Sequence, residues 1–352
     1  MPSDALDPLY TKIARKILTE TLHVNGGDSV TVESWDNGLP FARRVLAEAR
    51  ALGCTAVLIL EDERAYVEGV KRAPENSVGK MGKNEYGLLS GTDAYIFIPG
   101  QALGGYSKTL KPEERERSLR YNSSWYDAAE KAGLKGARLS FGYVGKDLAR
   151  FLRKSVKEVV RAQLRAALAD FGQVATKARM IAPLLTDGTE AELETERSTL
   201  TFFLKGEVAV EDGLVDEEDK RTGNNMTYVP PGFVSKEVDP ESANGTVVLS
   251  DSLTDLGVIS RAKLEFKEGR LVAWESADRA KIGELVASIP SERRRLRLLT
   301  IGLNPALGYG WGQDRFVEGS LTLGGFGFRG LVRKGTLRVA SSRVTAGGRL
   351  QV

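Results

Sequence analysis

Histidine and cysteine are almost absent from this chain of 352 residues, which contains one of each, His23 and Cys54. Zinc, cobalt and iron sites are normally built from imidazole and thiolate ligands, so a site that needs two histidines or two cysteines is excluded within one chain. A catalytic triad would have to use His23. Its position just past the first predicted helix favours an interaction with the helix dipole instead. Cys54 cannot form an intrachain disulfide, which favours a reducing compartment, and its apolar surroundings in sequence predict a small buried side chain.

Long apolar runs and an excess of one charge are also absent. No stretch of 18 apolar residues occurs, which excludes a membrane-spanning helix, and the N-terminal charges do not fit a secretory signal. We therefore expect a cytoplasmic protein with no membrane partner. Lys and Arg number 50 against 47 Asp and Glu, a balance that argues against a nucleic-acid partner. The basic cluster at 291–297 lacks interleaved aromatics and predicts a helix surface or an interface.

The pattern of apolar residues changes midway along the chain. The first half alternates helices and strands, which predicts an α/β domain with a parallel sheet flanked by helices. One long amphipathic helix is expected at 146–171. The second half reads as short strands joined by turns and predicts an α+β, largely antiparallel domain, interrupted by an amphipathic stretch at 277–302. We place the domains at 1–172 and 173–352. The first-half helices are predicted at 6–22, 39–52, 63–72 and 112–132, and the strands at 29–34, 54–60, 94–100 and 136–141.

Three short segments could carry chemistry. Residues 325–330 satisfy G-x-G-x-x-G, but a strand-like sequence follows where a dinucleotide site needs a helix, so glycines at a turn or at close packing are the better interpretation. The acidic run at 211–219 could hold calcium or magnesium, although a solvated loop is favoured. The aromatic segment at 309–312 could line a ligand pocket or form a packed corner, and the sequence leaves both open.

Several segments together resemble a known family. They are TLTFFLKGE (199–207), VPPGFV (229–234) with ANGTVVLSDSL (243–253), RRLRLLTIGLNP (294–305), NGGDSVTVE (25–33) and GKMGKNEYGLLSGTDAYIFIPG (79–100). In order and spacing they resemble the thermophilic metallo-aminopeptidases of the aminopeptidase S/T family. The resemblance implies an α/β N-terminal domain, a C-terminal catalytic domain and homodimers. It also implies removal of N-terminal residues from peptides at a centre of two divalent metal ions, which would activate water.

The positions that match the family's metal ligands carry other residues here. Its Glu after Pro-x-Gly corresponds to Phe233, and its Glu after Arg-Arg-Leu-Gly corresponds to Leu298. A family His corresponds to Thr322, and a final His-x-Asp pair best matches Phe328 and Gly330. We find no counterpart of the catalytic Tyr. The sequence thus predicts no metal and no other cofactor, with the vacated cavity filled by Phe233, Leu298 and Phe328.

These substitutions lead to three hypotheses. One is a non-catalytic, aminopeptidase-like pseudo-enzyme that binds a peptide or small ligand. Another is a structural protein that forms a homodimer or a larger homo-oligomer. The remaining hypothesis is an active aminopeptidase-type hydrolase with a relocated site, whose candidate residues are Glu207, Asp314 and Glu318 with Tyr309 or Lys205. Candidate ligand-binding residues are Lys205, Tyr309, Trp311 and Arg329.

Overall fold

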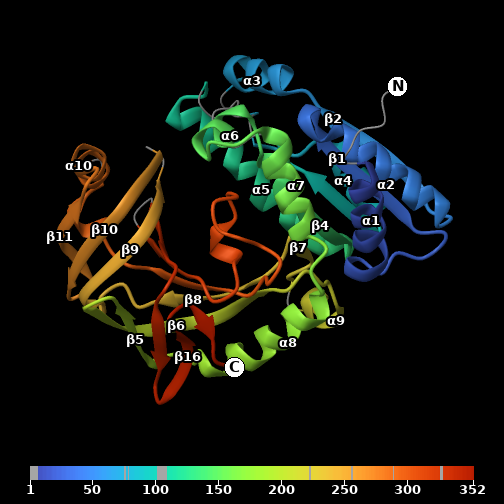
Figure 1. Cartoon of the computed structure of the whole chain (residues 1–352). Helices are drawn as coiled ribbons and strands as arrows, with labels where there is room; N and C mark the ends of the chain where they lie inside the picture. The colour runs from blue at the N-terminus through green and yellow to red at the C-terminus, as the bar shows by residue number, and fades with distance from the viewer. Residues whose placement is uncertain are drawn as a thin grey trace. The chain divides into compact units, whose positions relative to one another are not determined.

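The chain folds into two compact units, described here one at a time. The computed structural model describes residues 7–74, 77, 79–100, 109–221, 223–254, 257–287, 289–325 and 328–352, and Figure 1 shows their secondary structure. Unit 1 comprises Met1–Ala169 with Gly213–Pro230, and unit 2 comprises Asp170–Asp212 with Pro231–Val352. The segment 213–230 belongs to unit 1 because its strand β7 (Met226–Val229) pairs with β4 (Lys135–Leu139).

Unit 1 is built on a parallel sheet, as the alternating pattern predicts. Its strand order among the described residues is β2-β1-β3-β4-β7, and each neighbouring pair is parallel. The remaining strands are β1 (Ser29–Trp35), β2 (Thr55–Glu61) and β3 (Ala94–Ile98). The helices are α1 (Asp7–Lys16), a π-turn (Ile17–Thr21), α2 (Leu39–Ala51), α3 (Glu63–Arg72), α4 (Lys83–Ser90), α5 (Pro112–Ala132), α6 (Lys146–Phe151), α7 (Val156–Ala166) and α9 (Glu217–Arg221).

Helices cover both faces of this sheet. Helix α2 packs on β1 and β2, where Val30 and Val32 are buried. On the other face α5 packs on β3, with the rings of Trp125 and Tyr95 4.9 Å apart. Because side chains alternate along a strand, odd-numbered residues of β1 and β3 face the α5 side.

The predicted single helix at 146–171 is wrong, because the chain breaks there twice. Arg153 has a φ of 54°, a left-handed conformation that ends α6. A new helix begins at Ser155, whose hydroxyl accepts from the Glu158 N–H while the Glu158 carboxylate accepts from the Ser155 N–H. This reciprocal cap is a standard helix start. Asp170 then caps a further helix, α8 (Phe171–Ile181), in unit 2.

Unit 2 is largely antiparallel, as predicted. Strand β6 pairs with β9 in addition to its sheet neighbours, so β9, β14, β13, β12, β8 and β6 close into a barrel. Strands β9 and β10 are long and continue into the hairpin with β11 (Figure 1). The elements are β5 (Glu190–Thr195), β6 (Ser198–Glu211), β8 (Phe233–Val238), β9 (Asn244–Thr254), β10 (Gly257–Lys267), β11 (Arg270–Ser276), α10 (Arg279–Ala287), β12 (Leu298–Gly302), β13 (Leu321–Gly325), β14 (Phe328–Val332), β15 (Thr336–Val339), β16 (Ser342–Ala346) and β17 (Arg349–Leu350).

The stretch at 277–302 is not one amphipathic element. Helix α10 covers residues 279–287, and Pro290 lies just before a short 3-10 turn at 291–293. Residues 298–302 then form β12, which pairs with β8 and β13 inside the barrel sheet. This correction places Leu298 on a central strand.

Candidate functional site

One face of the barrel sheet carries most residues that the sequence singles out. Residues paired in register point to the same side of an antiparallel sheet. Ser235, Thr300, Thr322, Leu331 and Asp251 form one such row across β8, β12, β13, β14 and β9. We call the side of the sheet that bears this row the Thr322 face. The opposite side carries Val234, Leu299, Ile301, Leu321 and Leu323 and belongs to the hydrophobic core.

The five positions matched to family metal ligands divide between the two sides. Phe233, Leu298 and Thr322 share the Thr322 face by strand alternation. Phe328 and Gly330 point the other way, where Phe328 is 6% exposed and belongs to the core. A Cβ on Gly330 would lie 2.6 Å from Leu249 Cδ1, so a larger residue there requires the neighbouring core side chains to move.

The expectation that Phe233, Leu298 and Phe328 fill one vacated cavity is therefore wrong. Phe328 lies on the other side of the sheet, and Leu298 remains 36% exposed.

The loop at 303–320 is fixed at its base by Asn304. This residue is fully buried, its side-chain Nδ2 donates to the Pro231 carbonyl at 2.8 Å, and its carbonyl accepts from the Glu318 N–H at 3.1 Å. A Cβ on Gly232, whose φ is 128°, would lie 2.7 Å from Asn304 Cβ, so glycine is required there. The loop is thus tied both to the start of β8 and to itself.

Aromatic stacking occupies the position where the family resemblance implies a carboxylate. The Phe233 ring stacks on the buried Phe316 ring with centroids 5.0 Å apart and planes 20° from parallel. The Arg315 guanidinium lies 4.6 Å from the Phe316 centroid and 5.7 Å from the Phe233 centroid. Cation–π contacts of this kind stabilise a loop but offer no oxygen or nitrogen lone pair to a cation.

The aromatic segment 309–312 forms a turn closed by Asp314. The Asp314 carboxylate accepts from the N–H groups of Gly310, at 2.9 and 2.8 Å, and Trp311, at 3.2 Å. Gly310 and Gly312 both have a φ of 84°, which glycine adopts without strain. Arg333 pairs with Asp251, lies 4.0 Å from Asp314 and stacks 5.0 Å over the Tyr309 ring.

Sequence reasoning missed Asp251 and Arg333. The signal was partly present, because alternation along β9 and β14 places the polar residues at positions 251 and 329 on one side, and Arg333 directly follows β14.

Three buried polar atoms near this turn have no hydrogen-bond partner: Thr322 Oγ1, Tyr309 OH and Arg333 Nε. Thr322 is only 5% exposed. Burial raises the pKa of Asp251, an effect that Arg333 opposes and Asp314 reinforces. Burial likewise raises the pKa of Tyr309, so its hydroxyl stays protonated. Unpaired buried polar atoms are rare in folded proteins and suit a site that a ligand completes.

The other candidate residues do not converge on this turn. Lys205 on β6 and Arg329 on β14 are the first and last members of one register row. The row consists of Lys205, Glu237, Leu298, Gly324 and Arg329. Glu207 is exposed where the pairing of β6 with β8 shifts register. Glu318 pairs with Lys177 of α8. The geometry therefore does not assemble the relocated hydrolytic site.

The residues present do not fit a two-metal centre. Phe233 and Leu298 have no donor atom, and Thr322 offers one neutral hydroxyl, whereas divalent ions need several charged or imidazole ligands. Across the described part of the chain, no group of three or more His, Cys, Asp or Glu is arranged to hold a metal ion.

The glycine motif at 325–330 does not precede a helix. Residues 328–332 form β14, positions 326 and 327 lie outside the described residues, and a Cβ on Gly325 would lie 2.2 Å from the Arg295 carbonyl oxygen. The glycine-packing interpretation therefore accounts for Gly325.

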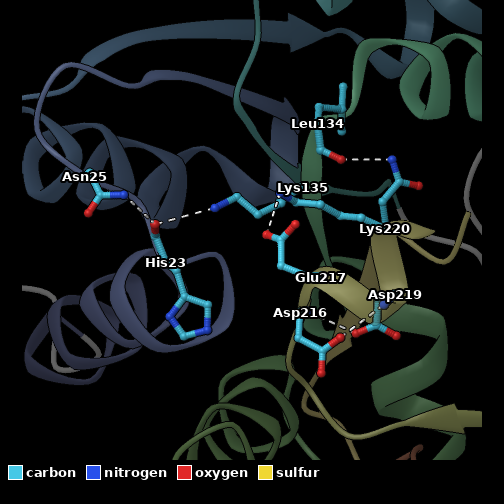
Figure 2. Close-up of polar contacts among 9 residues, drawn as sticks. His23, Asn25, Leu134, Lys135, Asp216, Glu217, Asp219 and Lys220 are labelled. Carbon is cyan, nitrogen blue, oxygen red and sulfur yellow. Dashed lines mark hydrogen bonds and ion pairs between the residues drawn. The ribbon is translucent and has the colours of Figure 1, made fainter. Parts of the chain in front are cut away.

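Figure 2 shows the surroundings of His23 and of Asp216, Glu217 and Asp219 of the acidic run, all of which belong to unit 1. The His23 carbonyl accepts from Asn25 Nδ2 at 3.1 Å and from Lys135 Nζ at 3.4 Å, while its imidazole joins none of the contacts drawn. Asp216 and Asp219 each accept the other's backbone N–H at 3.0 Å, and Glu217 pairs with Lys220. The Asp216 and Asp219 carboxylates shape the start of α9.

Among the helices of the described residues, none is long and apolar enough to cross a membrane.

Comparison with known proteins identifies the fold. No family model and no curated protein matches the chain. Among solved structures, wild-type AmpT from Thermus thermophilus matches with a TM-score of 0.65 and 14% identity, over 99% of this chain and 100% of that chain. A dioxygenase of 2,5-dihydroxypyridine from Pseudomonas putida KT2440 matches with a TM-score of 0.64 and 13% identity, over 98% and 97%. At such identities the likeness shows the fold alone, and it confirms the predicted aminopeptidase S/T-like fold class.

Proposed function

We propose that this protein is a metal-free, peptide-binding member of the aminopeptidase-like fold, with its ligand site on the Thr322 face. The carrying observation is the aromatic stack of Phe233 on Phe316 at a position where the family resemblance implies a metal-binding carboxylate. The fold does not fix the chemistry, since the two similar structures carry the names of different proteins, one of them a dioxygenase. The proposal therefore depends on the side chains of this site.

Charges around the 309–314 turn match the two ends of a short peptide. The Arg333 guanidinium is 39% exposed and can bind a terminal carboxylate, while Asp251 and Asp314, 35% and 23% exposed, can bind an ammonium group. The hydroxyls of Thr322 and Tyr309 are unpaired in the free protein and can bond a peptide amide. The Tyr309 and Trp311 rings supply apolar surface beside these groups.

The primary test is metal content together with turnover. Elemental analysis of the purified protein should find no stoichiometric divalent metal, and leucyl-p-nitroanilide should not be hydrolysed with or without added zinc, cobalt or manganese. Stoichiometric metal accompanied by turnover would end the proposal. Alanine variants at Asp314 and Glu318 would then decide whether the relocated hydrolase is correct, since unchanged activity excludes both carboxylates.

Binding is tested by calorimetric titration with leucyl-leucine. We expect Arg333→Met to weaken binding about tenfold, the cost of one charge-assisted pair, and Arg329→Met, on the preceding strand β14, to leave it unchanged. Equal affinity of both variants for leucyl-leucine would show that the peptide does not bind at the Thr322 face.

Assembly as a homodimer is a further proposal drawn from the family resemblance. Sedimentation velocity at several protein concentrations would distinguish a monomer, a dimer and a larger assembly.

A further inference from the structure

A second polar row crosses the parallel sheet of unit 1 near the carboxyl ends of its strands. Ile59, Glu33, Phe97, Arg138 and Tyr228 are paired in register across β2, β1, β3, β4 and β7 and therefore point to one side. We call this set the carboxyl-edge row. It shares no residue with the Thr322 face, so a ligand bound here would be independent of the proposed function.

The strand order marks this row as a ligand position. From β1 the chain passes to β2 on one side and then to β3 on the other, so the order β2-β1-β3 reverses between β1 and β3. In open α/β sheets, ligands bind outside the carboxyl ends of the strands at such a reversal. Glu33 on β1 and Phe97 on β3 flank it directly.

Burial separates this row from the one before it. Thr31 and Tyr95, two residues earlier on β1 and β3, are each 2% exposed, with Tyr95 packed under Trp125 of α5. All five members of the carboxyl-edge row keep partial exposure instead. On β1 and β3 the helices therefore cover the sheet up to this row and cover the row itself less completely, while Val57 of the earlier row, on β2, is exposed.

Arg138 is held by aromatic rings and lacks an ionic partner. Its guanidinium carbon lies 5.2, 5.5 and 5.8 Å from the ring centroids of Phe97, Tyr143 and Tyr228. Its Nε is buried without a hydrogen-bond partner, and it forms no ion pair within the described ranges. The Tyr143 side chain is one hydrogen-bond partner of the guanidinium, and the other N–H groups can donate to a ligand. These donors match the two oxygens of a carboxylate.

Glu33 provides the other end of the row. Its carboxylate accepts a hydrogen bond from the Tyr95 hydroxyl, and burial raises its pKa to about 7. Two strand spacings separate β1 from β4, about 10 Å between backbones, with the Phe97 ring between them. A ligand that reaches both groups must carry its anion at one end and a hydrogen-bonding group at the other, with a flat apolar centre.

We propose that the carboxyl-edge row binds a small planar carboxylic acid, with its carboxylate on Arg138, its ring against Phe97 and a remote hydroxyl or amino group on Glu33. The inference commits to an organic acid and not to inorganic phosphate, because phosphate has no apolar surface for Phe97 and is too small to reach from Arg138 to Glu33.

The test is calorimetric titration of the full chain with 4-hydroxybenzoate, benzoate and inorganic phosphate. We expect 4-hydroxybenzoate to bind most tightly, with affinity reduced at least tenfold in Arg138→Met. Arg43→Met, at an exposed arginine of α2, is the matched control and should bind like the wild type. Glu33→Gln should narrow the difference between 4-hydroxybenzoate and benzoate and leave benzoate affinity unchanged.

Three outcomes would overturn the inference: no binding of 4-hydroxybenzoate to the wild type, equal affinity in Arg138→Met, or phosphate binding as tight as that of 4-hydroxybenzoate. Near-ultraviolet circular dichroism establishes that each variant is folded. Should Arg138→Met not fold, Phe97→Leu keeps the test decisive, because loss of the ring must weaken 4-hydroxybenzoate binding while leaving phosphate unaffected.

Discussion

The carboxyl-edge row of unit 1 and the Thr322 face of unit 2 are both rows of polar positions on a sheet, yet they differ in their charges. The first places a cation, Arg138, and a carboxyl group, Glu33, on one row without pairing them. The second pairs Arg333 with Asp251 and places Phe233 and Leu298 where the family resemblance implies carboxylates. Unpaired charge is costly to retain in a folded protein. The contrast teaches that the reactive groups of a chain can lie in a different part of the fold from the active site of the family that the chain resembles.

The largest expected effect distinguishes Phe328 from Leu298, two residues that the sequence places in the same cavity. Phe328→Ala should lower the free energy of unfolding by about 3–5 kcal/mol, because it empties space in the barrel core. Leu298→Ala should cost less than about 1 kcal/mol, since more than a third of Leu298 is already exposed. Urea unfolding of both variants measures this difference. Similar losses would show that Leu298 is as deeply buried as Phe328.

The next effect concerns the pH dependence of unit 1 through Glu33. Its pKa is raised from 4.5 to about 7, chiefly by burial; Glu61 and Glu85 add to the rise, while the Tyr95 hydrogen bond and Arg138 oppose it. The folded state thus holds a proton that the unfolded state releases above pH 4.5. Stability should therefore fall as pH rises from 4.5 to 7, by about 3 kcal/mol in total, and stay level above pH 7.

Glu33→Gln should remove most of this slope, because the amide does not ionise. Unfolding free energies at pH 5 and pH 8 measure it, with Glu68→Gln, at an exposed glutamate of α3, as the control that keeps the slope. A slope that persists in Glu33→Gln would assign the titration to another group.

The architecture could be predicted from the sequence because it depends on the spacing of apolar residues and on the length of each segment. Helix α5 at 112–132 and strands near 29–34 and 94–100 match the structure, since residues 29–34 alternate and residues 94–98 are a short apolar run that Pro99 ends. The helix breaks at Arg153 and Asp170 depend on a left-handed residue and on caps, which apolar periodicity does not report. Strand β12 was missed because its residues 298–302 are almost all apolar and carry no alternation.

The candidate sites were harder to predict, because they depend on register between distant strands. Asp251 and Thr322 lie in one row only once β9, β14 and β13 are paired, and Glu33 meets Phe97 and Arg138 only through β3. The prediction placed Phe328 and Gly330 on the wrong side of the sheet, because a register shift of one residue turns every side chain of a strand to the opposite side.

A smaller effect is expected at Asp314, which holds the 309–312 turn. Asp314→Ala removes the acceptor of the Gly310 and Trp311 N–H groups and should cost about 1–2 kcal/mol, whereas Arg329→Ala, exposed on β14, should change stability by less than about 0.5 kcal/mol. Amide hydrogen exchange locates the change, with protection lost at residues 310 and 311 and kept in the barrel strands. Retained protection at both amides would show that the turn does not need the carboxylate.

The smallest stability effect, and the most informative for the comparison, is expected from Thr322→Val. The Thr322 hydroxyl is buried without a partner, so replacing it with a methyl group should leave unfolding free energy unchanged or raise it by up to about 1 kcal/mol. The same change should weaken leucyl-leucine binding, because the hydroxyl is available to a ligand, and should leave 4-hydroxybenzoate binding intact. Thr300→Val, in the same row, is the matched control for volume and shape. If Thr322→Val were destabilising by more than about 1 kcal/mol, the hydroxyl would have a structural partner and the Thr322 face would lose its strongest claim to a ligand.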